Sequence, residues 1–147
     1  MKQLTILSGL PASGKSTYAK KLVNENPENT VIVNRDSIRD GFGKYWVPSR
    51  EGLITDIEHY MIRTGLELDY HVIVDATNLN PKYVQAIEKI GKSFTIDGGI
   101  TINYKKFNTP LWLCVFRDFK RGLFGGRRVG YKVIKNFYDR YYKNTRA

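Results

Sequence analysis

The stretch that decides the fold is Gly9-Leu10-Pro11-Ala12-Ser13-Gly14-Lys15-Ser16-Thr17, which fits the pattern G-x-x-x-x-G-K-[ST] at every fixed position. Leu4, Ile6 and Leu7 form a short apolar run before it, and residues 18–23 are typical of a helix after it. This order of strand, loop and helix is the one that a phosphate-binding loop requires. The sequence therefore predicts binding of a nucleoside triphosphate. The alternative is a glycine-rich turn that binds nothing, which the complete motif in this setting disfavours.

Each part of this loop has an expected role. Its glycines let backbone N–H groups turn inward around a phosphate, and the N-terminus of the following helix adds a positive dipole end. Lys15 is expected to reach the outer phosphates as a catalytic residue, and Ser16 to ligate Mg²⁺. The predicted nucleotide-binding residues of the loop are Gly9, Pro11, Ala12, Ser13, Gly14, Lys15, Ser16 and Thr17.

Length and charge restrict the possible functions. The 147 residues suit a single domain, residues 1–147. Lys and Arg number 24 against 14 Asp and Glu, a formal net charge of +10, which either attracts polyanions or only solvates the surface. The single cysteine, Cys114, is expected in a buried helix, so we predict no disulfide framework and no cysteine-rich zinc site. A reducing, cytoplasmic compartment is the expectation, without a membrane span.

Strand-like and helical runs alternate along the chain, which predicts an α/β fold with a mostly parallel sheet flanked by helices. The four expected strands are residues 3–8, 30–34, 70–75 and 101–107. The second and third are continuously apolar, so we expect both in the middle of the sheet. A hairpin around Asp97-Gly98-Gly99 would add a fifth strand.

Polar residues follow the second strand, where ligands of such sheets bind. Asp36 is expected near the opening of a short helix, with Arg39 three residues later on the same face. The carboxylate of Asp36 has two possible roles, which are compatible. It can accept a proton from an attacking hydroxyl, or it can cap the helix N-terminus.

The end of the third strand carries a second polar cluster. Asp75 is placed like a Walker-B acid, so Ser16, Asp36 and Asp75 are the predicted Mg²⁺ ligands. For Asn78 a structural and a functional role are equally open. Asn80 and Pro81 are typical of the N-cap and first position of the next helix.

The remaining helices are expected at residues 48–68, from residue 81 until Gly91 ends it, and at 110–121 and 131–143. In the first of these, Leu53, Ile57, Met61 and Leu68 are interpreted as a core face rather than a ligand site. Residues 41–48 are rich in glycine and aromatic residues. They form either a loop whose Tyr45 or Trp46 stacks on a base, or a connector that these rings hold in place.

The most basic stretch lies near the C-terminus. Arg117 and Arg121 share a helical face, and Arg127 and Arg128 follow among glycines. Arginines on a hinged lid stabilise charge in phosphoryl transfer. The alternative is a solvated basic helix end.

Together these motifs resemble the 5′-hydroxyl polynucleotide kinase domain of phage and bacterial end-healing enzymes, over residues 4–142. The resemblance rests on residues 9–17, 34–39 and 77–81, and on residues 117–121 with 127–130. It implies a P-loop kinase fold with a basic helical lid. It also implies ATP or another NTP with Mg²⁺ as cofactors, DNA or RNA 5′-OH ends as partners, and a bacterial or phage-infected cytoplasm as location.

The resemblance also implies roles for single residues. Asp36 would be the general base, Arg39 would contact the first phosphate of the acceptor, and Arg121 would reach the donor phosphates with help from Arg117. The remaining implied substrate-binding residues are Thr77, Asn78 and Val129.

Two departures from the family concern Asp75 and the phosphatase domain. Ala76 stands where the family has an acidic residue before Thr77-Asn78, so the role of Asp75 is open. A phosphatase domain, which often accompanies this kinase domain, is not expected, because the sequence ends soon after the kinase region. Residues 96–99 are not expected to substitute for it, because that chemistry needs a second aspartate where Gly99 stands.

Three functions follow as hypotheses. The first is transfer of the γ-phosphate to a polynucleotide 5′-OH. The second is phosphorylation of a nucleoside or another small metabolite, for which the charge of +10 is unnecessary. The third is an ATP-gated nucleic-acid-binding module, which leaves Asp36 without a chemical task.

Overall fold

A four-stranded parallel sheet forms the centre of the computed structural model, which describes residues 2–95 and 99–142. The strands are β1 (Lys2–Ser8), β2 (Thr30–Asn34), β3 (His71–Asp75) and β4 (Ile100–Lys106), in the order β2-β3-β1-β4. All neighbouring strands pair in parallel. The predicted α/β fold and its four strands are therefore confirmed.

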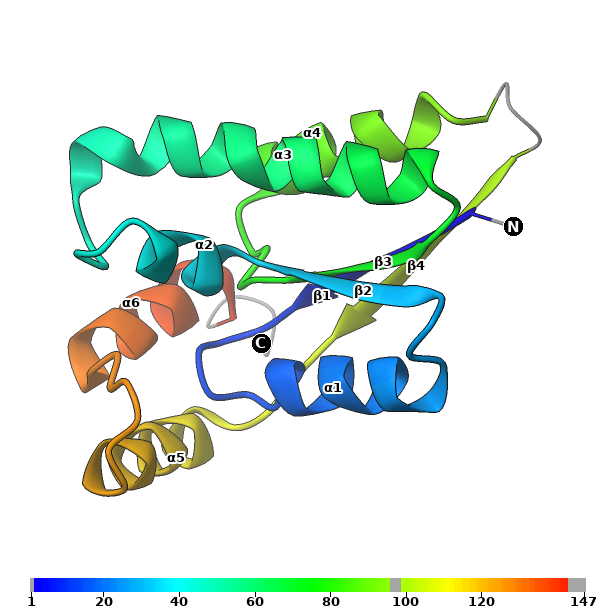
Figure 1. The fold of residues 1–147 in the computed structure, drawn as a ribbon. Helices are drawn as coiled ribbons and strands as arrows, with labels where there is room; N and C mark the ends of the chain where they lie inside the picture. Colours follow the sequence, from blue (N-terminus) through cyan, green and yellow to red (C-terminus); the bar gives the residue numbers. More distant parts are fainter. Residues whose placement is uncertain (1, 96–98, 143–147) are drawn as a thin grey trace.

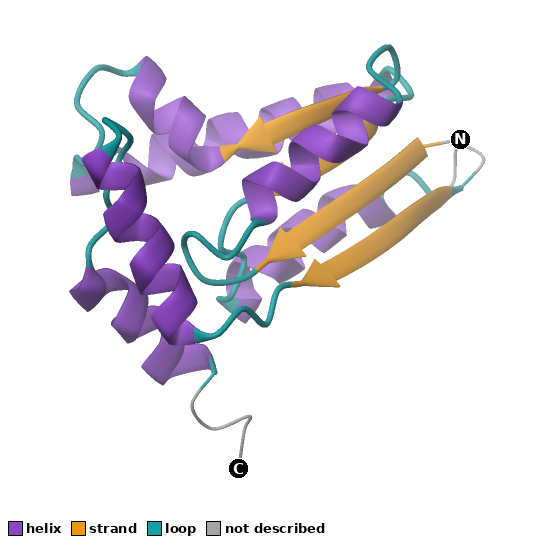
Figure 2. Cartoon of the chain, turned by 90° about the horizontal axis from the view of Figure 1, so that it is seen from below, coloured by secondary structure: helices purple, strands orange, loops and turns teal. Residues whose placement is uncertain are grey.

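Helices cover both faces of this sheet. Helix α1 (Lys15–Glu25) lies on one face, and α3 (Glu51–Glu67) and α4 (Pro81–Lys92) lie on the other (Figure 1). Helix α2 (Arg35–Gly41) follows β2 directly, and a short 3₁₀ turn, η1 (Pro48–Arg50), precedes α3. Helices α5 (Leu111–Leu123) and α6 (Tyr131–Tyr141) lie beyond the arrowheads of the strands (Figures 1 and 2). The carboxyl ends of the strands thus face α2, α5 and α6.

The core has three parts: one on each face of the sheet, and one in the lid, which consists of α5, α6 and the turn between them. The largest cluster joins β1, β2 and β3 to α3 and α4, and a smaller one joins Leu7 and Ile73 to Ala19 of α1. A third cluster contains Leu10 of the phosphate loop with Cys114 of α5 and Ile134 of α6. Because Leu10 is part of this third cluster, α5 and α6 are anchored directly on the loop.

Two packing predictions were wrong in part. Of the two strands expected in the middle of the sheet, β3 lies there, between β2 and β1, whereas β2 is an edge strand. The apolar side chains of β2 are covered by α1 and α3 on the two faces of the sheet. In α3 the buried face is Ile54, Ile62 and Leu66, whereas Leu53, Met61 and Leu68 are exposed. The reason is a buried glutamate, Glu58, which lies on the inner face and hid it from a purely apolar pattern.

The region around α4 also differs from the prediction. Gly91 does not end the helix, which continues to Lys92. A Cβ atom on Gly91 would lie 2.9 Å from Leu4 Cδ2 and 3.1 Å from Ile102 Cδ1, so glycine allows the helix to approach the sheet closely. Residues 93–95 form turns, and residues 96–98 of the predicted hairpin lie outside the described residues. The described part of the chain contains no fifth strand.

The two C-terminal helices occur where they were expected, as α5 and α6. Within residues 2–95 and 99–142, no helix is both long enough and apolar enough to cross a membrane.

Candidate active site

The phosphate loop connects β1 to α1 through an unusual backbone. Ala12 and Gly14 have positive φ angles of 63° and 104°. A Cβ atom on Gly9 would lie 2.7 Å from Ser13 Oγ and 2.9 Å from Phe107 Cβ. Positive φ at the alanine costs about 1–3 kcal/mol, a kind of strain that gathers at functional sites. The loop therefore has the tight, inward-turned backbone that a phosphate cradle needs.

Lys15 is the charged centre of this loop. Its ammonium donates to the carbonyl oxygens of Leu10 at 2.7 Å and Gly9 at 3.2 Å, and to Ser13 Oγ at 3.3 Å. The side chain is buried, and this burial lowers the pKa of Lys15 to about 8 against the attraction of Asp75. Asp36 and Arg121 also act on this pKa, in opposite directions, so groups from α2 and α5 lie within electrostatic range of Lys15.

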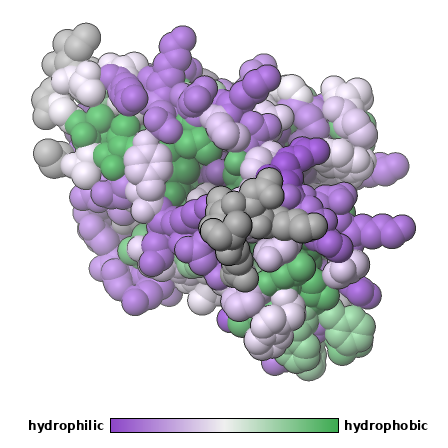
Figure 3. Space-filling view, turned by 180° about the vertical axis from the view of Figure 1, so that it is seen from behind, coloured by the Kyte–Doolittle hydropathy of each residue, from purple (hydrophilic) through white to green (hydrophobic). Residues whose placement is uncertain are grey.

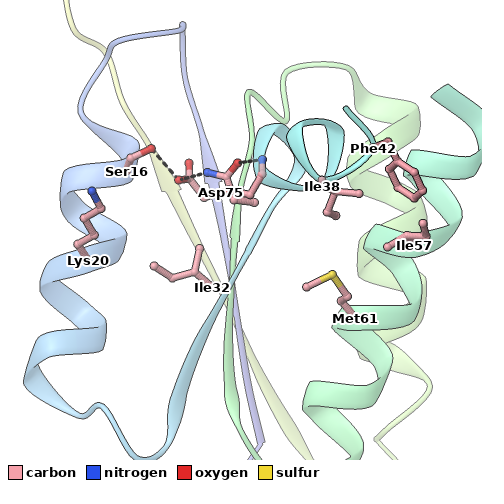
Figure 4. A pocket seen from close by; sticks show the side chains of 11 residues that line it. Ser16, Lys20, Ile32, Ile38, Phe42, Ile57, Met61 and Asp75 are labelled. Atoms are coloured by element: carbon pink, nitrogen blue, oxygen red, sulfur yellow. Dashed lines mark hydrogen bonds between the residues drawn. The ribbon is translucent and has the colours of Figure 1, made fainter. Parts of the chain in front are cut away.

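Asp75 and Ser16 meet as predicted for a metal site. Asp75 Oδ2 accepts hydrogen bonds from Ser16 Oγ at 2.8 Å and from Asn34 Nδ2 at 2.9 Å (Figure 4). A hydroxyl and a carboxylate at the end of a phosphate loop are oxygen donors of the kind that Mg²⁺ prefers. The structure thus brings Asp75 and Ser16 together, and their role as Mg²⁺ ligands stays a prediction. Asp36 has other partners and is not brought to this pair.

Helix α2 is capped by Asn34, so the capping role considered for Asp36 was wrong. The Asn34 side chain accepts from the backbone N–H of Ser37 at 3.0 Å. Asp36 Oδ1 instead accepts from Arg39 Nη1 at 2.9 Å and from the Tyr45 hydroxyl at 2.6 Å. The Asp36 side chain is 55% exposed, which leaves its carboxylate accessible to an incoming hydroxyl.

The contacts of Tyr45 favour the second interpretation of residues 41–48, a connector that its aromatic rings hold in place. Burial, followed by the hydrogen bond to Asp36, raises the pKa of Tyr45 to about 12, so the phenol is a donor at neutral pH. Its ring lies 5.7 Å from the Arg39 guanidinium and 3.8 Å from that of Arg127. Tyr45 is thus held in place, whereas Trp46 is 54% exposed, with the Arg39 guanidinium 5.7 Å from its ring; stacking of Trp46 on a base stays a prediction. The sequence interpretation missed the contact of Tyr45 with Asp36.

Arg39 is oriented by a carboxylate that sequence reasoning also missed. Glu51 of α3 accepts from Arg39 Nη2 at 2.6 Å and from Nε at 3.0 Å, and these bonds lower the pKa of Glu51. Arg35 donates to the Thr55 hydroxyl at 2.8 Å and pairs with Glu58 at 3.5 Å. The sequence contained a signal for these ion pairs. Two arginines four residues apart share one face of α2, and two glutamates seven residues apart share one face of α3.

The lid depends on Asp118, which had no predicted role. This buried carboxylate accepts from the backbone N–H groups of Val129 at 2.6 Å and Gly130 at 2.9 Å, and from Arg121 Nη2 at 3.2 Å. It therefore fixes the turn between α5 and α6. The Val129 side chain packs against the cluster of Leu10, Cys114 and Ile134, and its implied role in substrate binding stays a prediction.

The predicted lid arginines lie near the loop. A Cβ atom on Gly14 would be 3.8 Å from Arg117 Nη1, which places Arg117 over the loop. Arg127 forms an ion pair with Asp40, which joins the turn between α5 and α6 to α2. Arg117 and Arg121 thus lie toward the phosphate loop, whereas Arg127 lies at α2.

Thr77 and Asn78 have mainly structural contacts. The Thr77 carbonyl accepts from the Gly9 N–H at 3.0 Å. Asn78, at a φ of 44°, donates from Nδ2 to the carbonyl oxygens of Leu7 at 2.6 Å and Val74 at 3.4 Å. These bonds join the ends of β1 and β3 and favour the structural role of Asn78; its substrate contact stays a prediction.

A hollow of about 660 Å³ opens between α1, α2 and α3. Ser16, Asn34 and Asp75 lie at one end, and the apolar walls are Ile32, Ile38, Phe42, Ile57 and Met61 (Figure 4). Ile57 packs against the core as expected and also lines this hollow, whereas Met61, which was likewise interpreted as a core residue, is 39% exposed in it. Asp36 and Arg39 are not among its lining residues.

Comparison with known proteins places this geometry in a family. The sequence profile of a family described as an AAA domain matches residues 4–143. The chain belongs to this family of P-loop kinase domains. The kinase domain is 35% identical, over 142 residues, to L-seryl-tRNA(Sec) kinase of Methanococcus maripaludis, covering 94% of the chain and 52% of the relative. It thus spans about half the length of that curated relative.

Solved structures agree with this assignment. A chain of the Pnkp1/Rnl/Hen1 RNA repair complex matches the kinase domain with a TM-score of 0.82 and 27% identity, covering 99% of this chain and 46% of that one. The Mycobacterium tuberculosis APS kinase CysC, in complex with AMPPNP and APS, matches with a TM-score of 0.64 and 21% identity, covering 84% and 72%. At that identity the second likeness shows the fold alone. The resemblance to a P-loop kinase domain is confirmed, and phosphoryl transfer from a nucleotide is the general chemistry of its relatives.

Proposed function

We propose that this kinase domain transfers the γ-phosphate of ATP or another NTP to the 5′-hydroxyl end of DNA or RNA, in the cytoplasm of a bacterial or phage-infected cell. The observation that carries the proposal is the position of Asp36. Its accessible carboxylate is held by Tyr45 and Arg39 within electrostatic range of the phosphate-loop lysine, Lys15. A carboxylate so placed is suited to take the proton of an attacking hydroxyl.

The donor half would hold the nucleotide by its phosphates. The loop backbone and Lys15 would bind the β- and γ-phosphates, and Arg117 and Arg121 would neutralise the charge that develops on transfer. Mg²⁺ held by Ser16 and Asp75 would supply further positive charge at these phosphates.

The acceptor half would position the attacking oxygen. The 5′-oxygen forms a bond to the γ-phosphorus while the bond from that phosphorus to the β,γ-bridging oxygen breaks, and ADP leaves. The 5′-hydroxyl proton passes to Asp36. Arg39, fixed by Glu51, would contact the first phosphate of the acceptor and align the strand for in-line attack.

Charge and similarity both support a nucleic-acid acceptor. The net charge of +10 attracts polyanions and is unnecessary for a small metabolite. The structural relative in the RNA repair complex covers 99% of this chain at 27% identity. A module that only binds nucleic acid would leave the exposed Asp36 carboxylate without a task.

A second candidate is phosphorylation of a serine hydroxyl carried on tRNA. It is favoured by the 35% identity with L-seryl-tRNA(Sec) kinase. The same donor half and the same Asp36 would serve, and only the hydroxyl presented to them would differ.

The test is transfer of ³²P from γ-labelled ATP to a matched set of acceptors in the presence of Mg²⁺. The set contains 5′-OH DNA and RNA oligonucleotides, their 5′-phosphorylated forms, a nucleoside and seryl-tRNA. We expect label on 5′-OH oligonucleotides only. Labelling of the nucleoside with equal efficiency would support the small-metabolite hypothesis. Label confined to seryl-tRNA would support the second candidate, and no transfer at all would overturn the proposal.

One variant separates chemistry from binding. Asp36→Asn is expected to lower kcat by about 10²- to 10⁴-fold, the usual contribution of a general base, with ATP affinity retained. Asp56→Asn, an exposed carboxylate on α3, is the matched control and should behave like the unmodified protein. An unchanged rate for Asp36→Asn would remove Asp36 as the base.

A further inference from the structure

The outer face of α5 carries a row of large exposed apolar side chains. Trp112, Phe116, Phe119 and Leu123 are 70%, 56%, 46% and 68% exposed. Their spacing of four, three and four residues places them on one side of the helix. Phe124, 80% exposed, extends the row beyond the helix end. We call these five residues the α5 stripe. Figure 3 shows apolar side chains gathered at the end of the molecule that α5 and α6 form.

The fold itself does not explain the stripe. Cys114 and Asp118, on another face of α5, are buried in the lid, and Arg117 lies over the phosphate loop. The helix thus uses its inner faces for packing and for the donor site, while the stripe faces away from both. Exposed apolar clusters of this kind mark interaction surfaces.

The segment that carries the stripe is strongly basic. Residues 108–134 contain six basic residues and a single acidic one, Asp118, which is buried. The basic residues are Arg117, Lys120, Arg121, Arg127, Arg128 and Lys132. The Arg128 guanidinium lies 5.1 Å from the centre of the Phe119 ring, so positive charge borders the stripe directly. A second copy of this chain would bring the same positive charges together. Aromatic rings beside cationic groups are instead the pattern by which proteins bind single-stranded nucleic acid.

The stripe is also connected to the acceptor half of the site. Asp36 contacts Tyr45, whose ring lies 3.8 Å from the Arg127 guanidinium. Arg128, the next residue, contacts Phe119 in the stripe. This series of contacts runs from the proposed catalytic carboxylate to the outer face of α5.

We propose that the α5 stripe is an accessory binding surface for the single-stranded part of the acceptor. Bases stack on Trp112, Phe116 and Phe119, while Lys120 and Arg128 contact phosphates. This inference rests on the proposed function, because it extends the polynucleotide strand whose 5′ end lies at Asp36. It implies that affinity rises with acceptor length and falls with salt.

The first test measures binding without catalysis. The sequence contains two tryptophans, so in a Trp46→Phe background the fluorescence reports on Trp112 alone. We expect a ten-nucleotide oligothymidylate to quench this fluorescence, with an affinity that falls as salt is raised. Unchanged fluorescence at saturating oligonucleotide would overturn the inference. Quenching without any phosphate transfer would leave the stripe in place and remove the proposed kinase activity instead.

The second test uses acceptor length. Trp112→Ala and Phe116→Ala should each raise KM for a ten-nucleotide acceptor by about 5-fold or more, the effect of losing one base stack, and leave KM for a dinucleotide unchanged. Tyr60→Ala, which removes a 68% exposed ring on α3, is the control and should change neither. Equal effects on both acceptors would contradict the inference. So would a concentration-dependent dimer in sedimentation that Phe116→Ala dissociates, because the stripe would then join two copies.

Discussion

The phosphate loop at the centre of the donor half is one continuous stretch of nine residues, whereas the contacts of the acceptor half join segments far apart in the sequence. In the donor loop, Lys15 bonds to Gly9, Leu10 and Ser13, all within six residues of it. In the acceptor half, Asp36 is held by Tyr45, nine residues later, and Asp40 of the same helix pairs with Arg127, 87 residues later.

The two halves also differ in exposure. Lys15 is 7% exposed, whereas the side chain of Asp36 is 55% exposed. Lys15 is a buried charge in a strained loop, so we expect a substitution there to abolish activity almost completely. In the open acceptor half, several ion pairs share the task of positioning the side chains. A substitution that removes one of them should therefore lower activity only in part.

The largest expected effect is on the donor half, from Lys15→Met. Loss of the charge that faces the phosphates should lower kcat by at least about 10²-fold and weaken ATP binding. The same change should raise the free energy of unfolding at pH 7 by about 1–3 kcal/mol, because it removes a buried charge with a strongly lowered pKa. Urea unfolding with and without ATP measures both effects, and a variant of lower stability would contradict the second.

The pH dependence gives an independent check on Lys15. Its pKa is about 8 in the folded protein against an ordinary 10.5, so between these values the unfolded chain binds more protons. The contribution of Lys15 to stability therefore rises with pH from about 8 to 10.5, by up to about 3 kcal/mol. The stability difference between Lys15→Met and the unmodified protein should shrink over this range, and a constant difference would argue against a lowered pKa.

The next largest effect should come from the lid, through Asp118→Ala. Two backbone N–H groups, those of Val129 and Gly130, would lose their acceptor, and Arg121 would lose its partner. We expect a loss of about 3 kcal/mol in unfolding free energy. Asp139→Ala removes an exposed carboxylate paired with Lys135 and should cost less than about 0.5 kcal/mol. Similar losses in the two variants would show that Asp118 does not fix the lid.

A smaller, graded effect is expected in the acceptor half from Tyr45→Phe. The change removes the 2.6 Å hydrogen bond to Asp36 but keeps the ring against Arg127. Loss of about 1 kcal/mol of orientation should lower kcat by roughly 3- to 10-fold, without a change in ATP affinity. Because the pKa of Tyr45 is about 12, the ratio of the two rates should stay constant from pH 6 to 9. Tyr60→Phe is the control, and an equal effect there would remove Tyr45 as a positioning residue.

This difference between the halves also explains what could be predicted from sequence. The loop and the pair Asp36 and Arg39 were predictable, because motif and helix spacing place those residues locally. Tyr45 and Asp118 were not, because their contacts arise only when separate segments pack together. For Glu51 the spacing was visible in the sequence, but only the packing of α3 against α2 shows that it contacts Arg39.

The packing errors have the same origin. A buried, apolar β2 does not reveal its position in the sheet, since helices can cover both of its faces even at an edge. The inner face of α3 was misplaced because Glu58 is buried beside Arg35, which no pattern of apolar residues predicts.

The smallest expected effect concerns the link between lid and α2. Arg127 and Asp40 are 37% and 48% exposed, so a double-mutant cycle of Arg127→Ala and Asp40→Ala should give a coupling energy of only about 0.2–1 kcal/mol in urea unfolding. The coupling should decrease in high salt, because exposed pairs are screened. A coupling of zero would show that the two halves are held independently. A value well above this range would mean that the lid and the acceptor side form one rigid unit, and the contrast between a fixed donor half and a graded acceptor half would then fail.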